Sequence, residues 1–294
     1  MTQAVSAPAV PGPSSNGVPA PHALGRVLGG GRPLVCGILN VTPDSFSDGG
    51  LHDSLERAVE HGRRLAAEGA DLIDVGGEST RPGSRPPTPE EELARVVPVV
   101  AALAREVGVP LSVDTSRPEV MRAAVAAGAG MLNDVRALQA PGAVQAAADL
   151  GVPVCLVHMQ RSPESMQRDP HYADVVSEVR LFLAERLAAC CRAGIRREHL
   201  VVDPGFGFGK TLSHNVELLR SLDAIAALGV PVMVGLSRKS MVGALTGRPV
   251  GERLPGSVAA ALITAQRGAA VLRVHDVAAT RDALAVLDAV ATRP

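Results

Sequence analysis

The sequence predicts an α/β protein folded as a single (β/α)8 barrel. Eight short, β-branched apolar runs alternate with longer segments whose apolar residues recur at helical spacing. The runs are continuously apolar, which is typical of parallel strands covered on both faces by helices. Eight such units in about 260 residues match a closed barrel, and an open doubly wound sheet is the alternative.

Each apolar run predicts a strand, because it is bounded by polar or turn-forming residues. In chain order the expected strands are Leu34–Asn40, Asp71–Gly76, Leu111–Asp114, Met131–Asp134, Val152–His158, Leu200–Asp203, Val230–Ser237 and Val271–Asp276. The helices expected between them include Ser54–Glu68, Pro89–Val107, Pro118–Ala127, Val175–Ala193 and Ser257–Arg267. We expect Asp53 and Thr88 to cap the first two of these helices, since short polar side chains bind free N–H groups there and Pro89 suits the first helical position.

Polar residues lie at or just after the end of every expected strand. They are Asn40, Asp74, Asp114, Asn133 with Asp134, His158, Asp203, Ser237 to Lys239, and Arg273 to Asp276. A closed barrel brings all strand ends to one mouth, where barrel enzymes place their chemistry, whereas an open sheet spreads them along a line. The sequence therefore favours the closed barrel and predicts one polar mouth ringed by carboxylates, amides and a few cations.

The composition argues against several classes of partner. The 294 residues hold 29 Lys and Arg against 30 Asp and Glu, a net charge of -1, so we expect no nucleic-acid or membrane-surface binding. No apolar run approaches the roughly 18 to 20 residues that cross a bilayer, and no Lys or Arg precedes Arg26, so we expect no secretory signal. Cys36, Cys155, Cys190 and Cys191 form no CxxC pair. They are expected to be buried in a protein of a reducing compartment, which makes a cytoplasmic location the expectation.

The N-terminal residues differ from the rest of the chain. Prolines recur among Ala, Ser and Gly in residues 1–25, and such a stretch cannot bury enough apolar surface to order itself. We expect residues 1–25 to be a disordered tail without chemistry and residues 26–294 to form the barrel. The Gly29–Gly31 run is expected to be a turn at the edge of this domain.

Two carboxylates and an amide are candidates for ligand recognition. Asp114 and Asp203 follow buried strands, where a carboxylate is costly unless it is paired or hydrogen-bonded. With Asn133 they would suit a flat heterocycle that presents alternating donors and acceptors. The alternative for both aspartates is a helix N-cap, because both precede helical segments.

Three basic residues are candidates for binding an anion. Arg273 and His275 are two apart on one strand, so both side chains point to the same face. Lys239 follows Ser237 at the end of the preceding strand. The alternatives are an internal salt bridge for Arg273 and a solvated surface charge for Lys239.

Glycine-rich stretches need a separate interpretation. Gly205 to Thr211 resembles a phosphate-binding loop, but its spacing fits neither the P-loop nor the dinucleotide fingerprint, so we expect a flexible loop at the mouth. The loops after the first two strands, residues 40–50 and 76–84, are long enough to be lids or binding loops. Such loops can shield a reactive intermediate from water.

Six stretches resemble dihydropteroate synthase, in order and at the family's spacing. They are Gly37–Gly50 (GILNVTPDSFSDGG), Asp74–Gly83 (DVGGESTRPG), Ser112–Thr115 (SVDT), Asp203–Lys210 (DPGFGFGK), Ser237–Ser240 (SRKS) and Arg273–Asp276 (RVHD). The resemblance runs from about residue 33 to the C-terminus. It implies a TIM barrel, a homodimer and a role in folate biosynthesis. The family joins 6-hydroxymethyl-7,8-dihydropterin diphosphate to 4-aminobenzoate and releases pyrophosphate and dihydropteroate, and sulfonamides mimic the aminobenzoate.

The resemblance also implies roles for individual residues. The pterin-pocket positions are Asp74, Asp114, Asn133, Asp203 and Lys239. The diphosphate positions are Asn40, Arg273 and His275, with Asn40 as the ligand of a Mg²⁺ cofactor. The aminobenzoate positions are Thr80, Arg81, Pro82, Phe208 and Ser237. The residues expected to act in catalysis are Asp114, Lys239, Arg273 and His275.

The expected chemistry agrees with the residue types. Mg²⁺ with Arg273 and His275 would neutralise charge on the leaving diphosphate. Diphosphate departure leaves a cation at the pterin methylene carbon, which Asp114 could stabilise. The arylamine is a weak base and needs no strong general base.

One departure from the family and two alternatives remain. Arg161 stands where the family commonly has Gly, which puts the shape of the fifth loop in question. A pterin-binding methyltransferase that acts on methyltetrahydrofolate and a corrinoid protein has no reason to keep residues 80–82, 237–239 and 273–275 together. A non-catalytic paralogue that binds a pterin or a partner protein is expected to lose a loop or the diphosphate-binding cations first, and measurable turnover would exclude it.

Overall fold

The computed structural model describes residues 32–42, 51–78, 85–161 and 165–291, with the side chains of residues 51–53 left out. The expected tail, residues 1–25, and the Gly29–Gly31 turn lie outside these ranges, as do parts of both long mouth loops. The description that follows concerns the described residues.

Eight parallel strands form the centre of the molecule. They are β1 (Leu34–Asn40), β2 (Leu72–Gly76), β3 (Leu111–Asp114), β4 (Met131–Asp134), β5 (Val154–Val157), β6 (Leu200–Asp203), β7 (Met233–Val234) and β8 (Val271–Val274). Their order is β6-β5-β4-β3-β2-β1-β8-β7, and a parallel bridge between Val202 and Val232 joins the two ends. The predicted barrel is confirmed, and the open sheet is wrong.

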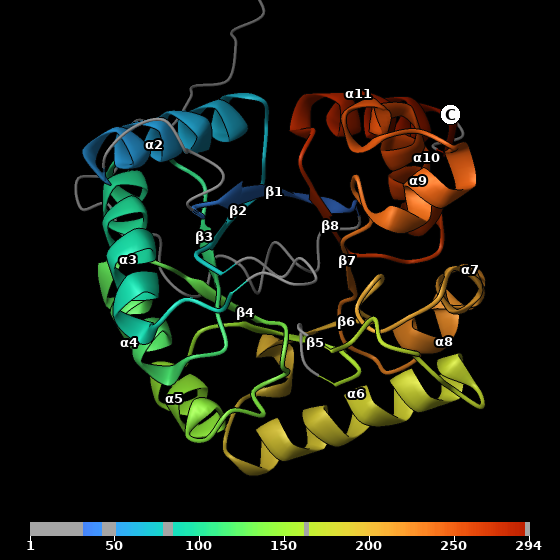
Figure 1. The fold of residues 1–294 in the computed structure, drawn as a ribbon, viewed down its shortest axis with the longest axis horizontal. Helices are drawn as coiled ribbons and strands as arrows, with labels where there is room; N and C mark the ends of the chain where they lie inside the picture. Colours follow the sequence, from blue (N-terminus) through green and yellow to red (C-terminus); the bar gives the residue numbers. More distant parts are fainter. Residues whose placement is uncertain (1–31, 43–50, 79–84, 162–164, 292–294) are drawn as a thin grey trace, which may run out of the picture.

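Helices surround the strands on the outside, as Figure 1 shows. They are α2 (Leu51–Ala67), α3 (Pro89–Glu106), α4 (Pro118–Ala127), α5 (Ala143–Leu150), α6 (Val175–Arg192), α7 (Leu212–Arg220), α8 (Leu222–Ala226), α9 (Ser240–Thr246), α10 (Leu254–Gln266) and α11 (Val277–Ala291). The Thr88 cap is confirmed: its hydroxyl accepts from Glu91 N at 3.2 Å, and Glu91 Oε2 accepts from Thr88 N at 2.8 Å. The Asp53 cap is wrong, because α2 already begins at Leu51.

Four expected strands are shorter than predicted: β2 lacks Asp71, β8 ends at Val274 rather than Asp276, and β5 and β7 lose more. β5 begins only at Val154, after Pro153, and β7 is reduced to Met233 and Val234. Proline has no N–H to donate to a neighbouring strand, so Pro153 and Pro231 shorten the start of β5 and β7. The run of β7 ends early because the chain turns at Leu236, whose carbonyl accepts from Lys239 N at 3.2 Å.

The core has two apolar layers separated by the strands. One lies between strands and helices. The other fills the barrel interior and includes Leu34, Cys36, Leu72, Met131, Cys155, Val201, Met233 and Val271. Cys36, Cys155 and Cys190 are buried as expected, whereas Cys191 is exposed because it lies on the outer face of α6. Among the described helices, none is both long and apolar enough to cross a membrane.

Candidate functional site

The predicted site residues occupy one layer of the barrel interior. Side chains two apart on a strand point to the same face. Each inward-facing residue of the apolar layer is therefore followed, two positions later, by another inward-facing residue. The polar side chains at these second positions are Asp74, Asn133, Asp203 and Arg273, and Asp114 lies on the same face two positions after the buried Ser112. The register places Gly76 beside Asp114 and Asp114 beside Asn133, so the expected single polar mouth is formed.

Arg273 lies at the centre of this layer. Its Nε donates to Asp74 Oδ2 at 2.6 Å, and its Nη2 donates to Asp114 Oδ2 at 2.9 Å. Burial lowers the pKa of Arg273, but the two carboxylates outweigh burial and raise it overall. The internal salt bridge that the sequence left as an alternative is therefore present. Through this salt bridge Arg273, which is expected to bind the diphosphate, contacts Asp74 and Asp114, which are expected to bind the pterin.

Asp74 and Asn133 each keep a buried acceptor without a partner. Asn133 Nδ2 donates to Asp74 Oδ2 at 2.9 Å. Asp74 Oδ1 and Asn133 Oδ1 have no hydrogen-bond partner, although Asp74 is only 1% exposed. An unpaired buried acceptor costs about 1–3 kcal/mol. These two oxygens are therefore suited to accept hydrogen bonds from a ligand.

The other two inward aspartates are also held in a buried environment. Burial raises the pKa of Asp114 to about 7, with Arg273 opposing. Burial likewise raises the pKa of Asp203, with Lys239 opposing, and Asp203 Oδ1 accepts from Gly205 N at 2.7 Å. Neither aspartate is a helix N-cap, since Arg117 and Thr211 hold those positions for α4 and α7. The N-cap alternative is wrong for both.

Lys239 is held at the mouth rather than in solvent. Its Nζ donates to the Phe206 carbonyl at 2.6 Å and lies 4.3 Å from the centroid of the Phe208 ring. Burial lowers its pKa to about 8, with Asp203 opposing. The alternative of a solvated surface charge is wrong. The contact with Phe208 also brings an expected aminobenzoate residue next to an expected pterin residue.

His275 and Ser237 form a pair at the ends of β8 and β7. His275 Nδ1 lies 3.1 Å from Ser237 Oγ, and His275 N donates to the same oxygen at 3.2 Å. Burial lowers the pKa of His275 to about 4, with Arg238 and Arg273 acting in the same direction. His275 is therefore neutral at pH 7 and can offer an anion an N–H group but no charge.

Three of the expected aminobenzoate residues, Thr80, Arg81 and Pro82, lie outside the described residues. Asn40 lies at the end of β1 and is half-buried. A Cβ atom built on Gly76 would be 3.8 Å from Asn40 Oδ1 and 3.4 Å from Asp114 Cβ, so both side chains flank this glycine. No group of three or more His, Cys, Asp or Glu residues suited to a metal ion occurs in the described part of the chain.

Lys210 is a site residue that sequence reasoning missed. It is 4% exposed, and its Nζ contacts His158 Nδ1 and the Gly205 carbonyl, each at 2.9 Å. This buried side chain cross-links the loop that the sequence predicts to be flexible. The available signal is the lysine that ends a glycine-rich run after the sixth strand.

Arg161, which stands where the family commonly has Gly, adopts a backbone conformation that favours glycine. Its φ is 65°, in the left-handed region that favours glycine, and its Nη1 donates to the Arg168 carbonyl at 2.5 Å. The backbone conformation suited to the family's usual glycine is thus present with arginine in its place.

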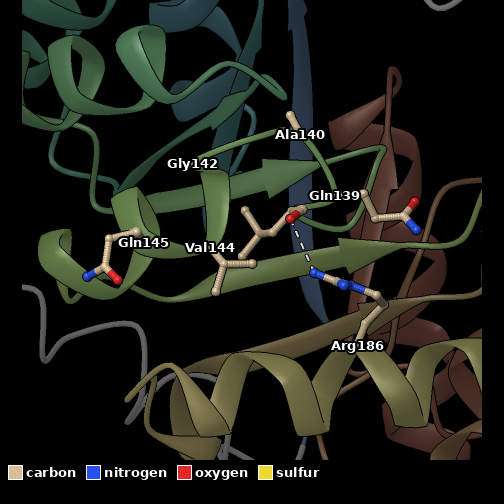
Figure 2. A pocket seen from close by; sticks show the side chains of 7 residues that line it. Gln139, Ala140, Gly142, Val144, Gln145 and Arg186 are labelled. Atoms are coloured by element: carbon tan, nitrogen blue, oxygen red, sulfur yellow. Dashed lines mark hydrogen bonds between the residues drawn. The ribbon is translucent and has the colours of Figure 1, made fainter.

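A hollow of about 520 Å³ lies outside the barrel, beside α5 and α6, and none of the predicted site residues lines it. Figure 2 shows Arg186 reaching across it from α6 towards the loop that follows β4. Arg186 donates to the carbonyls of Ala137 at 2.8 Å and Leu138 at 3.2 Å, which are left-handed residues of that loop. Arg186 thus stabilises the loop after β4, in which none of the predicted site residues lies.

Comparisons with known proteins agree with the geometry. The model of the family described as pterin binding enzyme matches residues 36–275. Dihydropteroate synthase of Escherichia coli (strain K12) is 53% identical over 267 residues, 91% of this chain and 95% of that protein. A Xanthomonas albilineans dihydropteroate synthase solved with 4-aminobenzoic acid has a TM-score of 0.85 and 61% identity, and covers 90% of this chain and 94% of that one. The same enzyme solved with 7,8-dihydropteroate has a TM-score of 0.82 and 58% identity, over 90% and 95% of the two chains.

Proposed function

Since the chain belongs to the family of pterin-binding enzymes, we propose that its barrel mouth performs the dihydropteroate synthase reaction with the residues named above. The reaction joins 6-hydroxymethyl-7,8-dihydropterin diphosphate to 4-aminobenzoate and releases pyrophosphate. It is a transferase reaction of folate biosynthesis. The observation that carries the residue assignment is the pair of unpartnered buried acceptors, Asp74 Oδ1 and Asn133 Oδ1, in one layer with Asp203.

The pterin ring binds in this layer. Its N–H groups donate to Asp203 and to the free oxygens of Asp74 and Asn133, which regain the hydrogen bonds lost on burial. Lys239 supplies a donor at the same edge from its position beside Phe206. A flat heterocycle with several donors is the kind of ligand that satisfies such a set.

Arg273 serves two sides of the site at once. Its guanidinium has five N–H donors. One from Nε goes to Asp74 and one from Nη2 goes to Asp114, which leaves donors for a diphosphate oxygen without breaking either ion pair. His275 adds a neutral N–H. Charge that develops on the departing diphosphate is stabilised by these fixed donors.

We propose that a magnesium ion binds this mouth together with the diphosphate of the substrate. Asn40 offers one amide oxygen, a ligand of the type that Mg²⁺ prefers, and the described residues hold no cluster able to bind a metal alone. Bound through Asn40 and diphosphate oxygens, the ion would supply charge neutralisation for the leaving group. Asn40 holds its side chain beside Gly76 and Asp114.

Asp114 stabilises the positive charge that the departing diphosphate leaves at the pterin methylene carbon. It does so when ionised, and Arg273 at 2.9 Å favours that form. The weakly basic arylamine attacks without a strong general base. Phe208 and Ser237, with Thr80, Arg81 and Pro82 of the second loop, are proposed to hold the aminobenzoate.

We also propose that the chain forms a homodimer. Large apolar side chains are exposed on α9, on α10 and on the connection between them: Leu245, Val250, Leu254 and Ile263. Sedimentation equilibrium should give twice the chain mass of 30.2 kDa. A monomer at micromolar concentration would contradict this proposal.

The assay of this function follows dihydropteroate by mass spectrometry with both substrates and Mg²⁺, and then with each left out. Product should require both substrates and fall when Mg²⁺ is chelated. A sulfonamide should compete with 4-aminobenzoate. Binding of pterin diphosphate without product would instead indicate a non-catalytic paralogue, and methyl transfer from methyltetrahydrofolate would indicate the methyltransferase.

A further inference from the structure

The loop that joins β6 to α7 contains one buried lysine whose side chain cross-links it, in addition to contacts from Tyr172 and Asn215. Lys210 Nζ contacts His158 Nδ1 at 2.9 Å, the Gly205 carbonyl at 2.9 Å and the Phe208 carbonyl at 3.1 Å. Burial lowers the pKa of Lys210, and Asp203 opposes this shift. In its ammonium form the group has three N–H donors and no acceptor, so these three partners use all of them and His158 Nδ1 is the acceptor. Burial and Lys210 lower the pKa of His158 to about 2, which keeps its ring neutral.

The loop can take this shape only because of its glycines. Gly205, Gly207 and Gly209 have φ values of 68°, 80° and 63°. A Cβ atom on Gly205 would lie 1.8 Å from the His158 carbonyl oxygen, and one on Gly209 would lie 2.7 Å from Gln160 Cβ. Glycines are the most flexible residues in an unrestrained chain. A loop of this composition therefore keeps one conformation only if other groups hold it, and Lys210 contributes three hydrogen bonds.

The same loop supplies both contacts of Lys239. The Phe206 carbonyl accepts from Lys239 Nζ, and the Phe208 ring lies against it. Lys210 binds the carbonyls of the residue just before Phe206 and of Phe208 itself. The position of the Lys239 ammonium and of the Phe208 ring thus depends on where Lys210 holds the loop.

We propose that Lys210 is a positioning residue for the synthase reaction: its three hydrogen bonds fix the 204–211 loop so that Lys239 and Phe208 meet the pterin and the aminobenzoate together. This inference rests on the proposed function. Lys210 acts through these two residues, because its own donors are all occupied within the protein.

The test compares Lys210→Met with Arg186→Met. Both changes remove a cation that binds two carbonyls of a mouth-side loop, but Arg186 serves the loop after β4, outside the predicted site (Figure 2). At a temperature where both variants are fully folded, Lys210→Met should raise the KM for 4-aminobenzoate and the Kd for pterin diphosphate about tenfold each, since small misplacements of binding groups are costly. Arg186→Met should leave both constants within about twofold of the wild type.

A second readout does not depend on turnover. The chain has no tryptophan, so Phe208→Trp creates a single fluorophore in the loop. Adding Lys210→Met to it should increase quenching by acrylamide, whereas adding Arg186→Met should not. Lys210→Gln, which keeps two N–H donors, should give smaller changes in the same direction if the Met variant fails to fold.

A double-mutant cycle decides whether Lys210 acts through Lys239. In a Lys239→Met background, Lys210→Met should change the Kd for pterin diphosphate by less than about twofold. Equal kinetic constants for the Lys210 and Arg186 variants, with an active wild type, would overturn the inference and leave a role in stability alone. An inactive wild type would instead overturn the proposed function, while the quenching experiment still reports on the loop.

Discussion

At the scale of single residues, Arg273 joins the parts of the site that the family resemblance assigns to different substrates. Its ion pairs with Asp74 and Asp114 lie inside the barrel, and Asp74 is almost completely buried. The arginine therefore serves both stability and ligand binding, and the two roles can be separated by experiment.

Arg273→Ala should destabilise the fold and weaken diphosphate binding. Removing one partner of a buried pair leaves an uncompensated charge and costs about 3 kcal/mol of unfolding free energy. Arg281→Ala is the matched control, because Arg281 pairs with Asp71 at the opposite end of the barrel and donates to the Gly69 carbonyl at 2.6 Å. Urea unfolding and pyrophosphate titration measure the two effects. Unchanged pyrophosphate affinity in the Arg273 variant would restrict its role to the salt bridge.

Asp203→Asn should weaken the binding of pterin diphosphate about 10- to 100-fold, because an amide N–H₂ replaces an oxygen that accepts from the ring. The change can keep the bond from Gly205 N, so the loop should persist. Asp134→Asn is the control. Asp134 lies on the outward face of β4 and accepts from Arg136 N at 2.8 Å and Leu138 N at 2.7 Å. Calorimetry that gives equal affinities for the Asp203 variant and the wild type would remove Asp203 from the pocket.

The rate should depend on pH through two residues of the site. Asp114 must be ionised, and its pKa is about 7, so kcat/KM should fall as the pH drops through 7. Lys239 must be charged, and its pKa is about 8, so kcat/KM should also fall as the pH rises through 8. The profile for pterin diphosphate should be bell-shaped and narrow, and Asp114→Asn should abolish its acid limb. An unchanged acid limb in that variant would contradict the role of Asp114.

At the scale of elements, the loop after β5 keeps a left-handed backbone conformation although arginine, and not glycine, occupies the position. Arg161 holds a left-handed φ of 65°. Arg161→Gly and Arg161→Ala both remove the bond to Arg168, but only alanine keeps the unfavourable backbone. The glycine variant should therefore be more stable than the alanine variant by about 1 kcal/mol, as measured by urea unfolding. Equal stabilities would show that the backbone carries no strain there.

The strands and the polar layer were predictable because they depend on local pattern. Leu34–Asn40, Leu111–Asp114, Met131–Asp134 and Leu200–Asp203 have the expected bounds, since each apolar run ends in one or two polar residues. The short β7 was not predictable, because hydrogen bonds from neighbouring chain segments decide how much of an apolar run pairs.

The partners within the site were predictable only as a set. Position at a strand end places Arg273, Asp74 and Asp114 in one mouth, but their pairing depends on side-chain reach across the barrel. Lys210 was missed for the same reason, since His158 lies 52 residues earlier in the chain. Sequence patterns predict which groups meet, whereas tertiary packing decides which of them bind one another.

At the scale of the whole molecule, the closed barrel explains why distant motifs form one site. Residues from β2, β3, β4, β6 and β8 reach the same interior layer because the parallel sheet closes on itself through the bridge between Val202 and Val232. Apolar side chains fill the interior on one side of this layer, so the substrates must enter from the mouth. The barrel thus orients three carboxylates, an amide and an arginine towards one bound ligand.

The most direct test of this account is pyrophosphate release from pterin diphosphate and Mg²⁺, measured with and without 4-aminobenzoate. The account predicts that 4-aminobenzoate stimulates release. The additional pyrophosphate released in its presence should equal the dihydropteroate formed, mole for mole. Tight binding of pterin diphosphate with no release in either condition would contradict it.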